Sequence, residues 1–236
     1  MNYLMTTHHL SKKYGMKFAL QDLNLQLPAG KIIGILGPNG SGKTTLLKLA
    51  AGLLTPSQGH IEIAGKPVGQ ESKSIVSYLP DRTYLRNNQR IADQLDFFQD
   101  FYGDFDRVRA ETMLYDLGIA PTARFGTLSK GNKEKVQLVL VMSRRAKLYL
   151  LDEPIGGVDP AARDYILRTI IHNYDPEATV LISTHLIADV EQVLDGFVFL
   201  RDGKVVRSGE VAAARAESGK SLDELFREVF QCFPGY

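Results

Sequence analysis

The sequence predicts an α/β protein built on a mixed sheet, with antiparallel strands near the N-terminus and an inserted helical subdomain. A continuous apolar run at residues 31–36, bounded by Pro and Gly, is typical of a buried strand. Comparable runs return at residues 148–151, 179–183 and 197–200. Between them, residues 91–117 are rich in helix formers and aromatic side chains and lack the alternation of a strand. A helical insert therefore interrupts the α/β core.

The other elements follow in chain order. Residues 44–54 carry leucine and alanine on one side and are expected to form a helix, and residues 59–65 alternate like an exposed strand. Residues 136–142 are expected to form a second helical segment. Gly203 marks a turn between short strands, and residues 221–230 are expected to form a closing helix.

The length of 236 residues fits one large domain with an inserted subdomain. We expect a single domain over residues 1–236. Its α/β core takes residues 1–80 and 147–210, the helical subdomain takes 81–146, and a helical tail takes 211–236.

Composition and charge exclude several classes of protein. A net charge of +1 argues against a nucleic-acid-binding surface. Cys232 is the only cysteine, which excludes an internal disulfide framework and fits a reducing compartment. No apolar run approaches the ~20 residues that span a bilayer, and the N-terminus lacks the pattern of a signal peptide. We therefore expect a cytoplasmic chain that works at a membrane only through a partner.

A glycine-rich loop follows the first buried strand. Residues 37–44 fit the pattern G-x-x-x-x-G-K-[ST] at the start of an expected helix. Glycines let the backbone curl so that its N–H groups face phosphate oxygens, and the helix adds the positive end of its dipole. Lys43 would bridge the β- and γ-phosphates, and Thr44 would bind Mg²⁺ through its hydroxyl. The alternative is a glycine-rich turn with a solvated lysine. The expected nucleotide-binding residues of the loop are Gly37, Pro38, Asn39, Gly40, Ser41, Gly42, Lys43, Thr44 and Thr45.

Two carboxylates end the apolar run that begins at Leu148. If this strand lies beside the phosphate loop, Asp152 reaches the metal. Glu153 would then lie near the γ-phosphate, where a carboxylate can polarise an attacking water. The alternative is a solvated pair at the end of a strand.

Four further motifs stand in a fixed order around the acidic pair. LSKGN at residues 128–132 precedes it, Asp159 follows it, His185 ends the next strand, and Tyr14 precedes the first strand of the main sheet. This order resembles the nucleotide-binding subunit of ABC transporters over nearly the whole chain. The resemblance implies a P-loop NTPase core of the RecA-like type, with ATP and Mg²⁺ as cofactors.

The resemblance also implies roles for individual residues. Residues 37–45 would be the Walker A loop, residues 148–152 the Walker B strand, and Glu153 the catalytic carboxylate. Tyr14 would stack on adenine, and His185 would hold Glu153 and the attacking water in line. The alternatives are a core aromatic for Tyr14 and an ordinary strand-end histidine for His185.

LSKGN differs from the usual family signature, Leu-Ser-Gly-Gly-Gln, at Lys130 and Asn132. Ser129 and Gly131 are retained and would place a hydroxyl and bare backbone at a helix N-terminus, a second anion site. In the family this site holds the γ-phosphate bound to the opposite subunit, and Asp159 belongs to the D-loop between the subunits. Signatures with lysine resemble those of bacterial antibiotic and peptide exporters whose ATPase and membrane subunits are separate chains.

Asp81 stands where the family usually has a glutamine that joins the core to the helical subdomain. A carboxylate suits Mg²⁺, so Asp81 could reach the metal through a bridging water. The alternative is a turn residue after Pro80 that is paired with or flanked by Arg82 and never meets the metal.

The leading hypothesis is an ATPase subunit of an ABC transporter, most consistent with an exporter. It would pair head to tail with a second, identical or paralogous, nucleotide-binding subunit and drive a multi-span permease at the inner face of the cell membrane. The aromatic residues at 97–105 would form the subdomain's core or line the groove that receives a helix of the membrane subunit. Alternatives are a soluble ABC-type ATPase with a regulatory or assembly role and, less compatible with LSKGN and His185, a small-molecule kinase.

Overall fold

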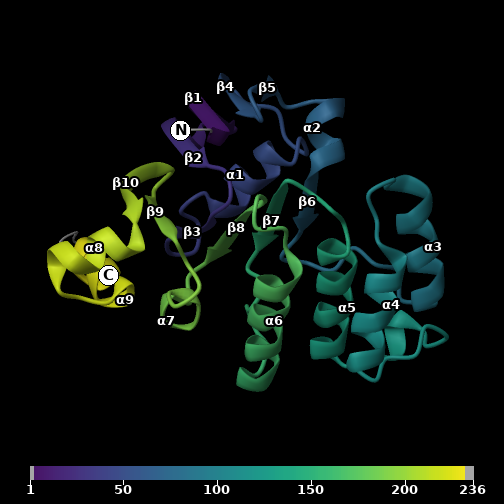
Figure 1. Ribbon diagram of the computed structural model, residues 1–236. Coiled ribbons are helices and arrows are strands. Elements are labelled where there is room, and N and C mark those ends of the chain that lie inside the picture. The colour runs from purple at the N-terminus through teal and green to yellow at the C-terminus, as the bar shows by residue number, and fades with distance from the viewer. Residues whose placement is uncertain (1–2, 232–236) are drawn as a thin grey trace.

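The computed structural model describes residues 3–231, apart from the side chains at positions 161, 162 and 231. Cys232, on which the expectation of a reducing compartment rests, lies outside the described residues. The described chain forms two sheets with helices packed around them (Figure 1). The predicted α/β class is confirmed.

A six-stranded mixed sheet forms the centre of the molecule. Its strands are β3 (Ile32–Leu36), β6 (Val76–Leu79), β7 (Leu148–Asp152), β8 (Thr179–Thr184), β9 (Gly196–Arg201) and β10 (Lys204–Glu210). They lie in the order β10-β9-β3-β8-β7-β6, with every pair parallel except β10 and β9. All residues of β3, β7 and β8 are buried, as expected of parallel strands covered on both faces.

A smaller antiparallel sheet covers one face of the central sheet. Its strands are β1 (Tyr3–Tyr14), β2 (Lys17–Pro28), β4 (Gln58–Ile63) and β5 (Lys66–Pro67), in the order β2-β1-β4-β5. Together with α1 (Lys43–Ala50) it buries an apolar cluster that includes Leu20, Leu46 and Leu181. The predicted N-terminal antiparallel strands are thus present, and they hold the loop before α1 against the central sheet.

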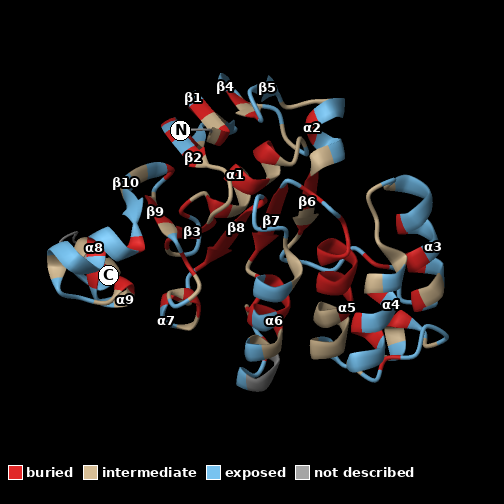
Figure 2. Ribbon diagram, viewed as in Figure 1, coloured by how far each residue is buried: buried red, intermediate tan, exposed pale blue. Residues whose placement is uncertain are grey.

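Helices cover the other face of the central sheet. They are α5 (Lys130–Met142), α6 (Pro160–Asn173), α7 (Ile187–Val190), α8 (Val211–Ser218) and α9 (Leu222–Gln231). Leu138, Ile170, Ile182, Phe199 and Phe230 share the apolar cluster of this face. Figure 2 shows the central strands buried between the two layers. None of the helices in the described part of the chain is both long and apolar enough to cross a bilayer.

The helical insert lies on the side of the sheet opposite α8 and α9 (Figure 1). It contains α3 (Ile91–Phe101), α4 (Arg107–Asp116), a 3-10 turn (Phe125–Thr127) and the start of α5, and it follows the short helix α2 (Gln70–Ile75) and strand β6. Its own core includes Leu95, Phe98, Leu114, Phe125 and Val139. The continuous helical texture predicted for residues 91–117 is two helices separated by a break at residues 102–106.

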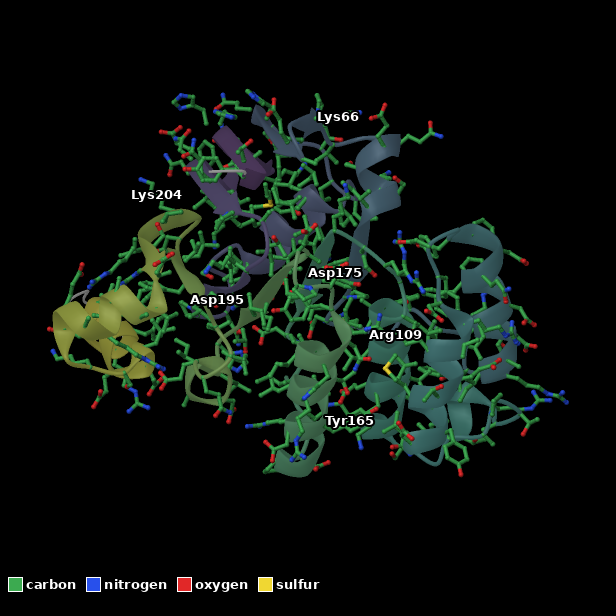
Figure 3. The ribbon with its side chains drawn as sticks, in the orientation of Figure 1. Lys66, Arg109, Tyr165, Asp175, Asp195 and Lys204 are labelled. Carbon is green, nitrogen blue, oxygen red and sulfur yellow. The ribbon has the colours of Figure 1, made fainter. Side chains whose placement is uncertain are left out.

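Two arginines fasten the insert to the core. Arg109 of α4 is labelled in Figure 3. It donates to Asn173 at the end of α6, through its Nε to Oδ1 at 3.3 Å and through Nη2 to the main-chain oxygen. Arg144 is nearly inaccessible and pairs with Asp104 through its Nε at 2.9 Å. Its Nη1 also donates to the carbonyl of Val76, at the start of β6, at 2.6 Å. The two halves of the domain are therefore joined by charge-assisted contacts.

The aromatic rings of the insert divide into two groups. Phe98 is buried and packs against Tyr102 and Phe105, with ring centroids 5.3 and 5.5 Å apart. Phe97 and Phe101 stack on each other at 4.4 Å but remain 49% and 69% exposed. The first group belongs to the insert's core, and the second lies on the surface.

A groove of about 600 Å³, here called the docking groove, runs beside the exposed rings. Its lining includes Leu53, Tyr78, Arg82, Phe97 and Tyr102, which come from the turn after α1, from β6 and the loop after it, and from α3 and its C-terminal cap. The groove therefore lies where the insert meets the core.

Two elements differ from the expectation from sequence. The helix expected over residues 44–54 ends at Ala50, because Gly52 adopts a left-handed conformation with φ of 66°. Helix α6 was not predicted. Pro160 suits the first position of a helix, but the helix presents a polar exposed face and only a narrow buried stripe that includes Ile166 and Ile170.

Candidate nucleotide-binding site

The loop between β3 and α1 is shaped by glycine. Gly40 and Gly42 have φ of 82° and 109°, which side chains rarely tolerate. A Cβ at Gly37 would lie 2.2 Å from the carbonyl oxygen of Leu200, and one at Gly42 would lie 2.5 Å from that of Ala19. No side chain caps the N-terminus of α1. No side chain therefore competes with an anion for the first N–H groups of α1.

Lys43, the first residue of α1, points back into the loop. Its Nζ donates to the carbonyl of Gly37 at 2.8 Å and to that of Pro38 at 3.2 Å. The same ammonium lies 3.3 Å from Oε1 of Glu153, and both side chains are largely buried. The end of β7 therefore lies directly beside the phosphate loop.

Asp152 is the buried acid at the end of β7. Its Oδ1 accepts hydrogen bonds from the hydroxyls of Thr44 at 3.0 Å and Ser183 at 2.6 Å. Burial raises the pKa of the Asp152 carboxyl above its usual value, although these two hydrogen bonds oppose the shift. The nearby charges of Asp81 and Glu153 raise the same pKa further. A divalent cation beside this carboxylate would offset the electrostatic cost of burying it.

Glu153 follows in a left-handed backbone conformation with φ of 50°. Such a conformation is costly for a residue with a Cβ and is often found at functional sites. The N–H of Glu153 donates to the carbonyl of Ser183 at 3.0 Å, which helps to hold the turn. Nδ1 of His185 lies 3.1 Å from Oε2 of Glu153, so the imidazole contacts this carboxylate and is more than a strand-end residue.

Asp81 lies on the same cavity as the loop and Glu153. Within the described part of the chain its carboxylate makes no ion pair or hydrogen bond, with Arg82 or any other residue. Its charge nevertheless raises the pKa of Asp152 and of Tyr78. Asp81 is thus an exposed residue of the bend after Pro80, flanked by Arg82 without an ion pair to it among the described residues, and it also lines the cavity.

These groups, apart from the buried Asp152, line one polar cavity of about 550 Å³, here called the phosphate pocket. It is lined by Ala19, Asn39, Gly40, Gly42, Lys43, Thr44, Thr45, Asp81, Glu153, Gly156, Gly157 and His185. Most of the residues that the sequence selected for phosphate, metal and water thus meet in one place.

The side chains here suit a Mg²⁺ ion that is bound partly by the protein and partly by phosphate oxygens. No group of three or more His, Cys, Asp or Glu side chains among residues 3–231 forms a metal cage by itself. Mg²⁺ is commonly bound by one or two carboxylates together with substrate phosphates. Asp152 and the hydroxyl of Thr44, 3.0 Å apart, form such a partial site beside the phosphate loop.

Among the residues that the resemblance singled out, Tyr14, Ser129, Gly131 and Asp159 do not line the pocket of their own chain. Ser129 caps α5 by accepting a hydrogen bond from Asn132 N at 3.3 Å, and Gly131 has no atom near its would-be Cβ. Tyr14 ends β1 and is 52% exposed, so it is not a core aromatic. Asp159 immediately precedes α6.

Two contacts of Asp152 were not expected from sequence. Ser183 was noted only as part of a motif, and Tyr78 was seen only as part of an apolar run. The hydroxyl of Tyr78 lies 3.5 Å from Oδ2 of Asp152. The sequence marks Ser183 and Tyr78 only by where they stand in the chain. Each lies at or near the end of a strand, and in the fold both of these strands flank β7.

Comparison with known proteins assigns the family. Residues 20–156 match the family model described as ABC transporter. The chain belongs to the ABC transporter family. Within it, the chain is an ATP-binding subunit with ATPase activity, which confirms the predicted family and enzyme class.

Individual relatives are similar along most of their length. The SkfA peptide export ATP-binding protein SkfE of Bacillus subtilis is 31% identical over 210 residues, which cover 86% of this chain and 88% of that protein. The lantibiotic transport ATP-binding protein SrtF of Streptococcus pyogenes is 28% identical, covering 94% and 96%. A solved ATP-binding subunit of an ABC transporter superposes with a TM-score of 0.86 at 28% identity, covering 96% of this chain and 99% of that one.

Proposed function

We propose that this ABC ATPase powers an exporter. It binds ATP with Mg²⁺, closes on a second nucleotide-binding subunit, identical or paralogous, and drives a separate multi-span permease. The observation that carries the proposal is the convergence of Lys43, Asp152, Glu153 and His185 around the phosphate loop.

In the proposed reaction, Lys43 and the N-terminus of α1 bind the β- and γ-phosphates. Glu153 accepts a hydrogen bond from a water that attacks the γ-phosphorus, and the bond to the β–γ bridging oxygen breaks to release ADP and phosphate. His185 orients the carboxylate of Glu153 and contacts the γ-phosphate. The distances of 3.3 and 3.1 Å around Glu153 support this arrangement.

Mg²⁺, when bound, neutralises charge on the β- and γ-phosphate oxygens. Thr44 and Asp152 would hold it directly, and Asp81 would reach it through a bridging water. The position of Asp81 on the phosphate pocket and its electrostatic effect on Asp152 support this assignment.

The second copy supplies the residues that each pocket lacks. Ser129 and Gly131 lie at the start of α5, outside the pocket of their own chain, and would bind the γ-phosphate held by the opposite subunit. Tyr14, which is exposed, would stack on the adenine of its own chain's ATP. Head-to-tail closure would therefore complete two ATP sites.

The export assignment rests on the signature and on the relatives. Lys130 gives the signature a form that resembles those of peptide and antibiotic exporters. Two similar proteins are described by name as peptide export and lantibiotic transport ATP-binding proteins. The docking groove, with Phe97 exposed on its rim, would receive a helix of the permease and hold the chain at the inner face of the membrane.

The variant Glu153→Gln tests the hydrolysis and pairing mechanism. We expect hydrolysis to fall by at least ~100-fold, because the general base is lost, and the ATP-bound pair to persist. Gel filtration with ATP and Mg²⁺ would detect the pair. Glu177→Gln, at an exposed glutamate away from the pocket, is the matched control.

A variant that remains monomeric with ATP and Mg²⁺ would contradict the pairing model. Co-purification from membranes with a multi-span protein would separate the transport role from that of an ABC-type ATPase in regulation or assembly.

A further inference from the structure

We propose that Tyr78 is a positioning residue that links the docking groove to the carboxylate of Asp152. Its ring lines the groove, and its hydroxyl holds the outer oxygen of the acid that binds the metal. The inference rests on the proposed function, which assigns the groove to the permease and Asp152 to Mg²⁺.

The strand register brings Tyr78 toward Asp152. Tyr78 of β6 pairs with Leu150 of the parallel neighbour β7. Asp152 follows Leu150 by two residues, and side chains two apart in a strand point to the same face. Tyr78 therefore lies on the face of the sheet that carries Asp152, and its hydroxyl reaches the carboxylate at 3.5 Å.

The two oxygens of Asp152 have different partners. Oδ1 accepts from the hydroxyls of Thr44 and Ser183. Among the residues that the structure describes, the hydroxyl of Tyr78 is the partner of Oδ2. Oδ1 is thus held by residues of α1 and β8. The position of Oδ2 depends instead on Tyr78 of β6.

Tyr78 also lines the docking groove. Its ring lines the cavity together with Leu53, Phe98 and Arg144. Arg144 also holds the beginning of β6, through Nη1 to the carbonyl of Val76 at 2.6 Å and through Nη2 to that of Ser74 at 2.8 Å. A helix seated in the groove would therefore contact both the ring of Tyr78 and the arginine that anchors its strand.

The length of the hydrogen bond makes it sensitive to such a contact. At 3.5 Å the contact is about 0.5 Å longer than the usual upper limit for a hydrogen bond between a hydroxyl and a carboxylate, so it is weak in this arrangement. A displacement of β6 by a few tenths of an ångström would shorten or break it. Occupancy of the groove would then alter how Asp152 presents its oxygens to the metal.

Tyr78→Phe tests the first step, because it removes the hydroxyl and keeps the ring. Mn²⁺ serves as the probe in place of Mg²⁺, with the β,γ-imido analogue of ATP bound to the full chain, and electron paramagnetic resonance measures free Mn²⁺. We expect the Mn²⁺ dissociation constant to rise about 2–10-fold, the loss expected for one hydrogen bond. Binding of the analogue without metal should not change.

Tyr149→Phe is the matched control. Tyr149 is buried in the neighbouring strand and donates its hydroxyl to the carbonyl of Arg144, away from the phosphate pocket. We expect this variant to bind Mn²⁺ like the wild type. An equal Mn²⁺ affinity for Tyr78→Phe and the wild type would overturn the inference. A wild-type chain that bound neither the analogue nor Mn²⁺ would instead overturn the proposed function.

Leu53→Trp tests the link to the groove, because the larger side chain fills part of it beside Tyr78. We expect this change to alter Mn²⁺ affinity at least twofold when Tyr78 is present and to have no effect in the Tyr78→Phe background. An absent effect, or the same effect in both backgrounds, would overturn the link.

Discussion

At the scale of single residues, the carboxylates of the phosphate pocket are the most informative groups. Glu153 lies between the ammonium of Lys43 and the imidazole of His185, on strained backbone. Asp152 is buried with three hydroxyl groups around it. Asp81 lines the same cavity without a partner of its own in the described chain. The three carboxylates therefore differ in their bonding partners. Replacing each one is expected to have a different effect on hydrolysis, metal binding or stability.

Replacing Asp81 tests whether it serves the metal. We expect Asp81→Ala to lower Mg²⁺-dependent hydrolysis and to raise the Mg²⁺ concentration needed for half-maximal rate, whereas Asp81→Gln should be tolerated. Arg82→Ala is the control, because Arg82 lines the docking groove and not the phosphate pocket. Unchanged hydrolysis and Mg²⁺ dependence in Asp81→Ala would exclude the metal role.

Replacing Asp152 exposes a cost to stability. The pKa of the Asp152 carboxyl is raised in the folded state. Ionisation of this carboxyl therefore destabilises the folded protein when the pH is above the pKa of the unfolded chain, about 3.9, and has no such cost at lower pH. We expect Asp152→Asn to abolish hydrolysis. We also expect it to melt at a higher temperature than the wild type near pH 7.5, by about 2–4 °C for each kcal/mol of free energy that the buried charge costs the folded state. The difference should shrink as pH falls toward about 4. Calorimetry across pH checks this, and a lower melting temperature at pH 7.5 would contradict it.

At the scale of elements, strand ends and helix starts explain what could be predicted. The sequence places Lys43 after a buried strand and Asp152 at the end of another, and carboxyl ends of parallel strands meet at one edge of a sheet. Local pattern was therefore enough for the core of the site. The contact of Tyr78 with Asp152 needs β6 to be the neighbour of β7. Strand order is set by long-range packing, and no local signal in the sequence reveals it.

The aromatic segment of α3 divides into a core face and a surface face, and a pair of variants separates them. Phe97→Ala removes an exposed ring, so we expect weaker co-purification with a membrane partner and little change in melting temperature. Phe98→Ala removes a buried ring and should lower the stability of the insert by about 3–5 kcal/mol. Thermal melting and membrane pull-down distinguish the two, and full co-purification of Phe97→Ala would contradict the docking role.

At the scale of the whole molecule, the two proposed halves of an ATP site do not line one pocket, although Lys130, next to Ser129, donates to the carbonyl of Gly157 on the lining of the phosphate pocket at 3.2 Å. The phosphate pocket lies at the ends of β3 and β7, whereas Ser129 and Gly131 start α5 outside it. The sequence indicated both halves, but only the fold separates them within one chain. This separation is what favours a paired assembly.

Mixing two inactive variants tests the paired assembly. Lys43→Ala destroys the phosphate loop, and Ser129→Glu places a negative charge where the opposite γ-phosphate would bind. We expect neither variant alone to hydrolyse ATP and their mixture to recover at most about a quarter of the wild-type rate. Half of randomly mixed pairs are mixed, and each then has one complete site of two. No recovery after mixing, with both variants folded, would contradict head-to-tail pairing.

The place of β6 in the sheet has a mechanical consequence. It is one of the two edge strands of this sheet and has only four residues; its one strand partner in the sheet is β7, and Arg144 also donates to the carbonyl of Val76. β7 and β8 are held on both sides. Force applied at the groove would therefore deform β6 first and leave the stiffer strands in place. If a permease docks as proposed, its force would reach Asp152 through an edge strand that has one strand partner.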